Sequence, residues 1–234
     1  MDKKIKLLKI FIPVIFVISS LLFACVDDYG RHNYDNYNFG TSLGLIQTST
    51  TGVPFLVNLD NGSILTPSDA SFPGFTPLDS QRVWVRFNPL SNTNINDSTF
   101  NYVGKIYDIQ NILFKDIKNI SQVKSDSVGH DEITVKNAWI QPKDILNLDL
   151  RFFTNGSVHY INLIDNGKGD GITNPFVLEL RHNARGDNPI YPAYATVSFK
   201  LNYLRKAGKN PVSFFISYTD YNGNQIQIPK TYSY

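Results

Sequence analysis

Cysteine is almost absent from this chain, because only Cys25 occurs among 234 residues. A single cysteine excludes an internal disulfide framework of the kind that stabilises small secreted domains. Stability must therefore come from the burial of apolar side chains. The roughly 210 residues from Cys25 onward are enough for one large domain or two ordinary ones.

The sequence also lacks an apolar run of the length that a permanent membrane helix needs. Several lysines between Lys3 and Lys9 precede an apolar segment at residues 10–22, which contains Pro13. This segment is shorter than the roughly 20 residues that cross a bilayer. The pattern therefore predicts a secretory signal peptide over residues 1–24.

Cys25 follows this leader directly, and Leu22-Phe23-Ala24-Cys25 resembles the lipobox of bacterial lipoproteins. The resemblance implies that Cys25 is lipidated and that the membrane is one partner of the mature chain. The alternative is an ordinary signal peptide with a chance cysteine near its end. Asp27 and Asp28 resemble the acidic export signal of surface lipoproteins, which implies the cell-surface side of the outer membrane. If they only solvate a linker, the periplasmic face is the alternative.

An excess of positive charge is missing from the mature chain. Removal of the leader leaves 18 basic and 19 acidic residues, a net charge of about −1 in place of the +2 of the whole sequence. Binding to nucleic acid depends on the neutralisation of phosphates by Lys and Arg. The charge balance and the exported location therefore argue against nucleic acid as a partner.

Motifs of catalysis and metal binding are missing as well. The sequence has no Gly-x-Ser-x-Gly elbow, no phosphate-binding glycine loop and no cysteine nucleophile once Cys25 is lipidated. The four histidines are far apart, and residues 165–171 lack the ligand spacing of a calcium loop. We therefore expect no catalytic residues, no metal, no cofactor and a protein that is not an enzyme. The alternative is a hydrolase whose paired carboxylates come together only in the fold.

What the sequence does contain is β-strand pattern, which begins after a polar tether at residues 25–39. Five expected strand segments lie at residues 42–48, 53–59, 63–66, 81–87 and 100–114. Asp60-Asn61-Gly62 is a tight-turn sequence that predicts a hairpin, and the polar residues 91–98 predict a loop. Five strands over residues 40–118 predict a small barrel of the oligonucleotide/oligosaccharide-binding (OB) type.

A polar linker is expected at residues 119–131, and a second β domain at residues 132–234. Its apolar or alternating runs lie at residues 133–140, 145–154, 158–164, 176–182, 193–201, 212–218 and 225–232. Asn-Gly pairs and related turn sequences separate these runs. Together they predict an all-β chain whose second domain is a seven-stranded antiparallel β-sandwich. No segment of the mature chain has the period of an amphipathic helix.

Residue combinations in both predicted domains resemble one known family. They are Asp60-Asn61-Gly62, Pro73-Gly74-Phe75, Gln81-Arg82-Val83, Asn137-Ala138-Trp139-Ile140 and Leu178-Glu179-Leu180-Arg181-His182-Asn183-Ala184. With these residues and its order of domains, the chain resembles the NigD-like lipoproteins of the Bacteroidetes. The resemblance implies an OB-like domain, a C-terminal β-sandwich, and a role in bacteriocin immunity that is inferred for the family from its locus.

Two groups of side chains are candidates for binding or for structural roles. Arg82, Trp84 and Arg86 share one face of a predicted strand, where an aromatic ring between cations is typical of glycan or protein recognition. The alternative is that Trp84 covers the barrel where it packs on the sandwich. His182 shares a face with apolar neighbours, so we expect it to be buried, and Glu179 is expected to form a same-face ion pair with Arg181.

Two tripeptides, Asp97-Ser98-Thr99 and Asp126-Ser127-Val128, resemble the O-glycosylation motif of exported Bacteroidetes proteins. The resemblance implies modification of Ser98 and Ser127 in exposed loops. Two functions remain from the sequence. One is a non-enzymatic, lipid-anchored envelope protein that binds an unknown envelope protein, in bacteriocin immunity or envelope assembly. The alternative is a surface lipoprotein that binds a glycan.

Overall fold

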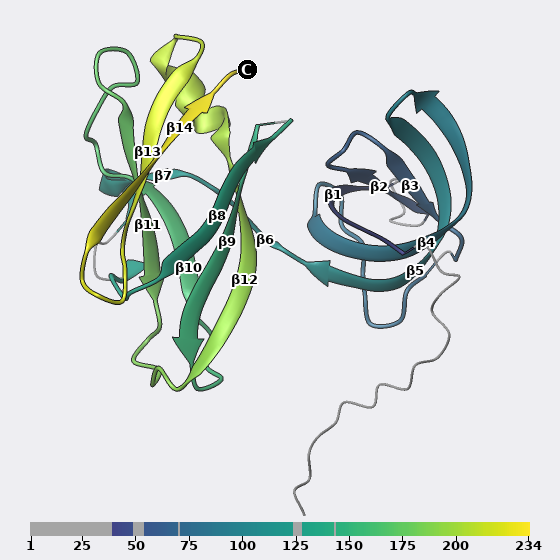
Figure 1. The fold of residues 1–234 in the computed structure, drawn as a ribbon, viewed down its shortest axis with the longest axis horizontal. Coiled ribbons are helices and arrows are strands. Elements are labelled where there is room, and N and C mark those ends of the chain that lie inside the picture. The colour runs from purple at the N-terminus through teal and green to yellow at the C-terminus, as the bar shows by residue number, and fades with distance from the viewer. Residues whose placement is uncertain (1–38, 49–53, 70, 124–127, 143) are drawn as a thin grey trace, which may run out of the picture. The chain divides into compact units, whose positions relative to one another are not determined.

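The computed structural model describes residues 39–48, 54–69, 71–123, 128–142 and 144–234 (Figure 1). The predicted leader, Cys25, Asp27, Asp28 and Ser127 lie outside these residues, so their roles stay predictions. Within the described ranges, no helix has the length and apolarity needed to cross a bilayer.

The N-terminal domain is a closed five-stranded barrel in the order β1-β2-β3-β5-β4. Its strands are β1 (Gly40–Thr48), β2 (Phe55–Leu59), β3 (Ile64–Pro67), β4 (Arg82–Asn96) and β5 (Thr99–Asn111). Neighbouring strands pair antiparallel except for β3 and β5, which run parallel. The predicted barrel and the predicted hairpin of β2 and β3 are both confirmed.

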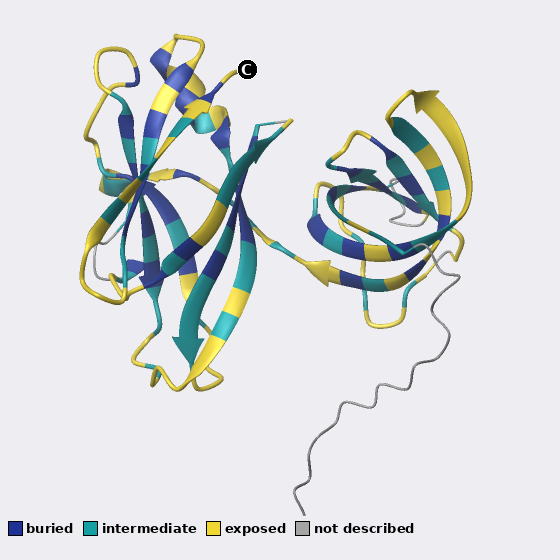
Figure 2. Cartoon of the chain, in the orientation of Figure 1, coloured by how far each residue is buried: buried dark blue, intermediate teal, exposed yellow. Residues whose placement is uncertain are grey.

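Alternation along β4 explains how the barrel closes on a dry interior. Val83, Val85 and Phe87 are buried in the barrel core, whereas Trp84 is half-buried and Arg86 is exposed. Figure 2 shows the same alternation of buried and exposed residues along the barrel strands. The period of two residues thus places one row of β4 side chains inside and the other outside, as the sequence predicts.

The sequence predicts a loop at the polar residues 91–98, and this prediction is wrong, because most of the stretch is strand. β4 continues to Asn96 and pairs with β5 up to Thr99, which leaves only Asp97 and Ser98 in the turn. Residues 91–98 are exposed, so this part of the hairpin has no buried row to produce apolar alternation. Ser98 lies in the exposed turn, as its predicted modification requires.

The C-terminal domain has a five-stranded sheet, β14-β13-β11-β10-β7, and a four-stranded sheet, β6-β12-β9-β8. Its strands are β6 (Leu113–Asp116), β7 (Lys118–Asn119), β8 (Thr134–Gln141), β9 (Ile145–Thr154), β10 (Tyr160–Asp165), β11 (Phe176–Asn183), β12 (Tyr191–Lys200), β13 (Val212–Thr219) and β14 (Gln225–Tyr232). Each of the seven predicted runs corresponds to one strand, from β8 to β14.

The sandwich begins earlier than the predicted boundary after residue 118. Leu113–Asp116 pairs with β12 and Lys118–Asn119 pairs with β10, so both segments belong to the sandwich and not to the barrel. Both pairs are parallel, as is the pair of β11 and β13, so the domain is not wholly antiparallel. The predicted linker at residues 119–131 includes the end of β7 and the short helix η1 (Ile120–Gln122).

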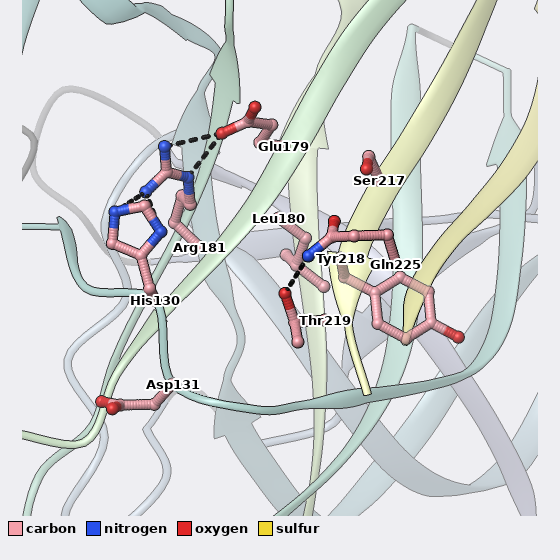
Figure 3. Close-up of a pocket in the computed structure, with 9 residues that line it drawn as sticks. All are labelled: His130, Asp131, Glu179, Leu180, Arg181, Ser217, Tyr218, Thr219 and Gln225. Carbon is pink, nitrogen blue, oxygen red and sulfur yellow. Dashed lines mark hydrogen bonds and ion pairs between the residues drawn. The ribbon is translucent and has the colours of Figure 1, made fainter. Parts of the chain in front are cut away.

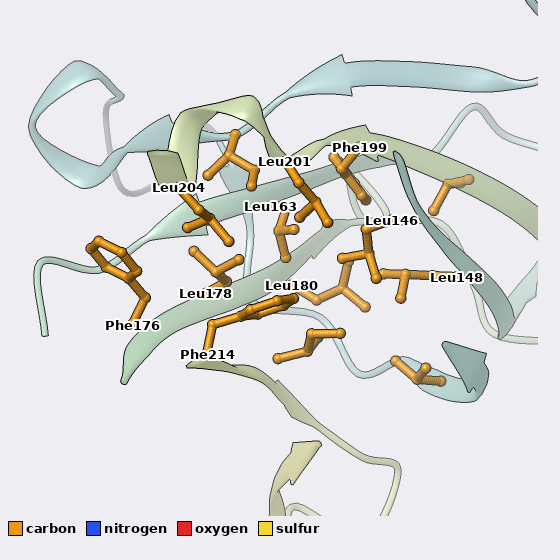
Figure 4. Packing of buried hydrophobic residues seen from close by; sticks show 14 of the residues in the cluster. Leu146, Leu148, Leu163, Phe176, Leu178, Leu180, Phe199, Leu201, Leu204 and Phe214 are labelled. Atoms are coloured by element: carbon orange, nitrogen blue, oxygen red, sulfur yellow. The ribbon is translucent and has the colours of Figure 1, made fainter. Parts of the chain in front are cut away.

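Apolar side chains from both sheets fill the space between them (Figure 4). Leu146 and Leu148 come from the four-stranded sheet, and Leu178 and Phe214 come from the five-stranded one. A 3₁₀ helix, η2 (Leu201–Ala207), adds its own leucines to this core. The sequence places residue 201 in a strand and does not predict this helix, which has only seven residues and is too short to show a helical period.

Ile216→Ala in β13 is expected to lower the free energy of unfolding by about 2–5 kcal/mol, because it leaves a cavity in this closed core. Urea denaturation followed by circular dichroism measures the change. Ile172→Ala makes the same substitution at an exposed position and should stay within about 0.5 kcal/mol of wild type. Equal losses in the two variants would contradict the assigned core.

Candidate functional site

Arg82 joins the barrel to the sandwich and is only 1% exposed. Its guanidinium donates to both carboxylate oxygens of Asp60, at 2.5 and 2.6 Å. It also donates to Oδ1 of Asn147 on β9, at 2.9 Å, and to Oγ of Ser198 on β12, at 3.3 Å. A buried guanidinium with all these partners is closed to a soluble ligand, so Arg82 is a structural residue and not part of an exposed binding face.

Trp84 and Arg86 lie on the same side of β4 as Arg82 but beyond the buried contact. Trp84 is half-buried, and the exposed Arg86 holds its guanidinium 5.9 Å from the ring centre of Phe39. The structure therefore separates the three predicted residues into one buried ion-pair partner and two that reach the surface. Ligand binding by Trp84 and Arg86 stays a prediction.

A polar cavity of about 170 Å³ opens on the five-stranded sheet (Figure 3). Arg181 donates from Nε to Glu179 at 2.7 Å and pairs with the same carboxylate through a second nitrogen at 2.6 Å. The third guanidinium nitrogen contacts the His130 ring and donates to the Gly129 carbonyl. The predicted Glu179–Arg181 pair is confirmed. Asp131, which also lines the cavity, accepts instead from the backbone N–H of Ala184.

Burial by itself raises the pKa of Glu179. Hydrogen bonds from Asn166 and Arg181 outweigh burial, so the net pKa of Glu179 lies below its usual range. A carboxylate held ionised beside its own arginine is poorly suited to act as a general acid. We therefore interpret the Glu179–Arg181 pair that lines the cavity in Figure 3 as a structural ion pair that solvent can reach.

A second cluster forms where the β9–β10 and β11–β12 loops meet, at one end of the sandwich. Oδ2 of Asp187 accepts from Thr154 Oγ1 and from the backbone N–H of Asn155, both at 2.7 Å, and from the N–H of Ser157 at 3.3 Å. The same oxygen lies 3.1 Å from Nε2 of His159. One carboxylate oxygen thus ties residues 154–159 to residues 184–190.

Two histidines continue this cluster into the sandwich. Nδ1 of His159 lies 2.8 Å from Nε2 of His182, and Nδ1 of His182 lies 3.0 Å from the carbonyl oxygen of Glu132. Both rings pack against Phe152 at tilted angles, with centroids 5.0 and 5.3 Å away. Burial is the main cause that lowers the pKa of His182, which is 2% exposed, and its predicted position inside the core is confirmed.

Sequence reasoning treats these histidines as unconnected because 23 positions separate them. Antiparallel pairing of β10 with β11 places His182 opposite Ile161, two residues beyond His159. Gly129 permits the segment before β8 to approach β11 closely, since a Cβ there would lie 2.4 Å from the His182 carbonyl oxygen. Only the strand register could have revealed the cluster.

Exposed apolar and aromatic side chains project from the same two loops. Val158, Tyr160, Ile190 and Tyr191 are between 42% and 70% exposed, and Arg185 holds its guanidinium 5.5 Å from the Tyr160 ring centre. We call these five residues the loop-end surface. Exposed residues predominate in these loops in Figure 2. Tyrosine and arginine at an exposed, apolar site are typical of protein interfaces.

Family models match both domains of this chain. The model of the NigD-like N-terminal OB domain covers residues 43–112, and that of the NigD-like C-terminal β-sandwich domain covers residues 116–232. The chain belongs to the NigD-like family. These limits agree with the structure in assigning Ile112 and earlier residues to the barrel.

Solved structures share this two-domain fold. A protein from Parabacteroides distasonis whose name relates it to a toxin is 25% identical, with a TM-score of 0.67 over 84% of this chain and 94% of that one. A NigD-like immunity protein from Bacteroides caccae is 22% identical, with a TM-score of 0.63 over 84% and 98%. A candidate lipoprotein from Bacteroides fragilis is 12% identical, with a TM-score of 0.56 over 83% and 96%. No curated protein matches the chain.

Arg82→Ala is expected to lower the free energy of unfolding by about 3–5 kcal/mol, because it leaves Asp60 and the Asn147 amide without their buried partner. Denaturant unfolding measures the loss. Arg86→Ala removes an exposed arginine from the same strand face and should cost less than about 1 kcal/mol. If the Arg82→Ala variant were as stable as the Arg86→Ala variant, the result would contradict the assignment of Arg82 to a buried contact between the two domains.

Asp187→Asn is expected to remove part of the acid sensitivity of the fold. The Thr154 hydroxyl and the Asn155 N–H hold the pKa of Asp187 well below its usual range. A lowered folded-state pKa contributes stability that is present above about pH 4 and is lost as the pH falls. Urea midpoints between about pH 7 and pH 3 should therefore fall less steeply in this variant than in wild type. Asp69→Asn in the barrel is the control, and parallel curves for all three proteins would contradict the prediction.

Proposed function

We propose that this chain is a non-enzymatic, lipid-anchored envelope protein that binds another protein through the loop-end surface and thereby serves bacteriocin immunity. In this proposal Cys25 carries the lipid, and Asp27 and Asp28 direct the protein to the cell surface. The name of the Bacteroides caccae structure supports the immunity role, and that of the Bacteroides fragilis structure supports the anchor.

The loop-end surface is the observation that carries the binding role. Val158 and Tyr191 are exposed although they are apolar or aromatic, and Arg185 stacks on Tyr160 beside them. Asp187 holds both loops through hydrogen bonds to backbone and side chain, so the surface is ordered before a partner arrives. A preordered surface loses less conformational entropy on binding, which favours affinity.

Recognition of a protein also agrees with the chemistry of the described residues. Glu179 is paired with Arg181, and Asp187 is the acceptor of several hydrogen bonds, so both carboxylates already have partners. Binding of a partner protein involves no bond cleavage, which suits such an arrangement.

A glycan is the second candidate ligand, and one observation favours it. Tyr194 on β12 is 70% exposed and lines a shallow depression of about 390 Å³ with Lys136, Asp149 and Thr196. The Thr196 hydroxyl donates to Asp149 at 2.7 Å. An exposed ring beside a carboxylate, an ammonium group and a hydroxyl offers a sugar both an apolar face and hydrogen-bonding groups.

The immunity role is tested in a strain of the source bacterium that lacks this gene, challenged with bacteriocin-containing supernatant from a competing strain. We expect deletion to sensitise the cells and the wild-type gene to restore survival. The double variant Val158→Ala/Tyr191→Ala should protect about tenfold less, because exposed tyrosines are frequent hot spots of binding energy. Cys25→Ala should also fail, since the protein would lose its anchor.

Tyr107→Ala replaces an exposed tyrosine of the barrel and is the matched control, with full protection expected. Thermal unfolding and immunoblotting establish that each variant is folded and present at equal amounts. Unchanged sensitivity of the deletion strain would overturn the immunity role. Full protection by the double variant would overturn the assigned surface, and loss of protection in Tyr194→Ala alone would favour the glycan-binding depression.

A further inference from the structure

The Asp187, His159 and His182 side chains form a row with a hydrogen-bond acceptor at each end. The Asp187 carboxylate stands at one end and the Glu132 carbonyl oxygen at the other. Between them are three contacts, at 3.1, 2.8 and 3.0 Å. Each contact is short enough for a hydrogen bond, and each therefore needs one proton between its two heavy atoms.

Two neutral imidazole rings supply only two N–H groups, because each ring then has one donor nitrogen and one acceptor nitrogen. Three contacts between two acceptors need three protons. With two protons, one contact must bring lone pairs face to face, either between the two rings or against Asp187 or Glu132. Such a contact inside a protein costs free energy because neither atom can turn to water.

The third proton cannot reside on Oδ2 of Asp187. That oxygen already accepts from the Thr154 hydroxyl and from the backbone N–H of Asn155. Donors that converge on one carboxylate oxygen stabilise its ionised form. The proton must therefore be held by one of the rings.

We infer that the His159–His182 pair holds three protons in the folded protein, so that His159 is an imidazolium ion paired with Asp187, and that this charge locks the loop-end surface. His159 is the ring in contact with the carboxylate, at 3.1 Å. His182 lies deeper and donates to the Glu132 carbonyl oxygen. The claim about the loop-end surface rests on the proposed function, whereas the claim about the proton does not.

The charged groups around the pair are few. Asp187 approaches from the β11–β12 loop and contacts His159, and Asp131 acts on His182 from the segment before β8. Phe152 from β9 covers both rings and carries no charge. The two acidic groups favour the cation.

Loss of the third proton affects both loops together. One of the three contacts then lacks a proton, and in every case His159 loses the positive charge that pairs with Asp187, whose Oδ2 also holds Asn155 and Ser157. The pair must lose its proton as the pH rises, so the lock is present at low pH and weakens through the titration of the pair. Histidine is the side chain whose charge changes in the range that cells and their surroundings span.

Two-dimensional NMR of ¹⁵N-histidine-labelled protein tests the proton directly. We expect both ring nitrogens of His159 to be protonated at about pH 6, and His182 to be protonated at Nδ1 alone. A neutral His159 with a single N–H at this pH would overturn the inference. Because wild-type protein suffices, the result does not depend on whether any variant folds or whether a partner is known.

Amide hydrogen exchange of Asn155 and Ser157 tests the lock. From about pH 6 to pH 9, protection in wild type should fall about tenfold beyond the intrinsic pH effect, as expected for one lost buried hydrogen bond. His159→Gln removes the titrating ring and should show no such change, whereas His130→Gln removes an exposed histidine and should behave as wild type. Equal pH profiles in wild type and His159→Gln would overturn the lock. If NMR and hydrogen exchange gave the expected results but deletion of the gene left bacteriocin sensitivity unchanged, only the proposed function would be overturned.

Discussion

The buried guanidinium of Arg82 on the barrel strand β4 donates hydrogen bonds to two strands of the sandwich, β9 and β12. A charge removed from water is costly unless every donor finds a partner. All three guanidinium nitrogens of Arg82 donate to partners, which come from three places, the turn after β2, strand β9 and strand β12. Two of these hydrogen bonds, to Asn147 and Ser198, cross from the barrel to the sandwich, and both are strengthened by the charge of the donor.

Asp187 applies the same constraint at one end of the sandwich, where the β9–β10 and β11–β12 loops meet. One carboxylate oxygen collects donors from both loops, and the row of histidines behind it carries the balancing charge that we infer. Both clusters therefore use one ion to organise segments that are distant in sequence. The difference is accessibility, because Arg82 is enclosed whereas Asp187 lies beneath a surface that a partner can reach. The binding role and the sensitivity to pH that we propose rest on the second cluster alone.

The alternation of apolar and polar residues along the sequence is sufficient to predict most of the strands. The alternation at residues 81–87 and 145–154 appears in the structure as β4 and β9, because one face of each strand is buried and the chain repeats every two residues. Where both faces are exposed, as from residue 91 to 96, this signal disappears and the hairpin was predicted as a loop. Residues 113–118 are assigned to the barrel by the sequence because the apolar run at residues 100–114 continues past β5, and residue 119 is assigned to the linker. Their pairing with β12 and β10 is a long-range choice that composition does not record.

The candidate sites divide in the same way. By itself, the sequence determined the all-β class, the two domains, the burial of His182 and the pairing of Glu179 with Arg181. Each of these follows from residue type and from spacings of one or two residues along a strand. The enclosure of Arg82 and the joining of His159 to His182 and Asp187 were decided only by the tertiary structure. These contacts span from 22 to 116 positions, and the strand pairing that closes such distances depends on the whole fold and on no single segment.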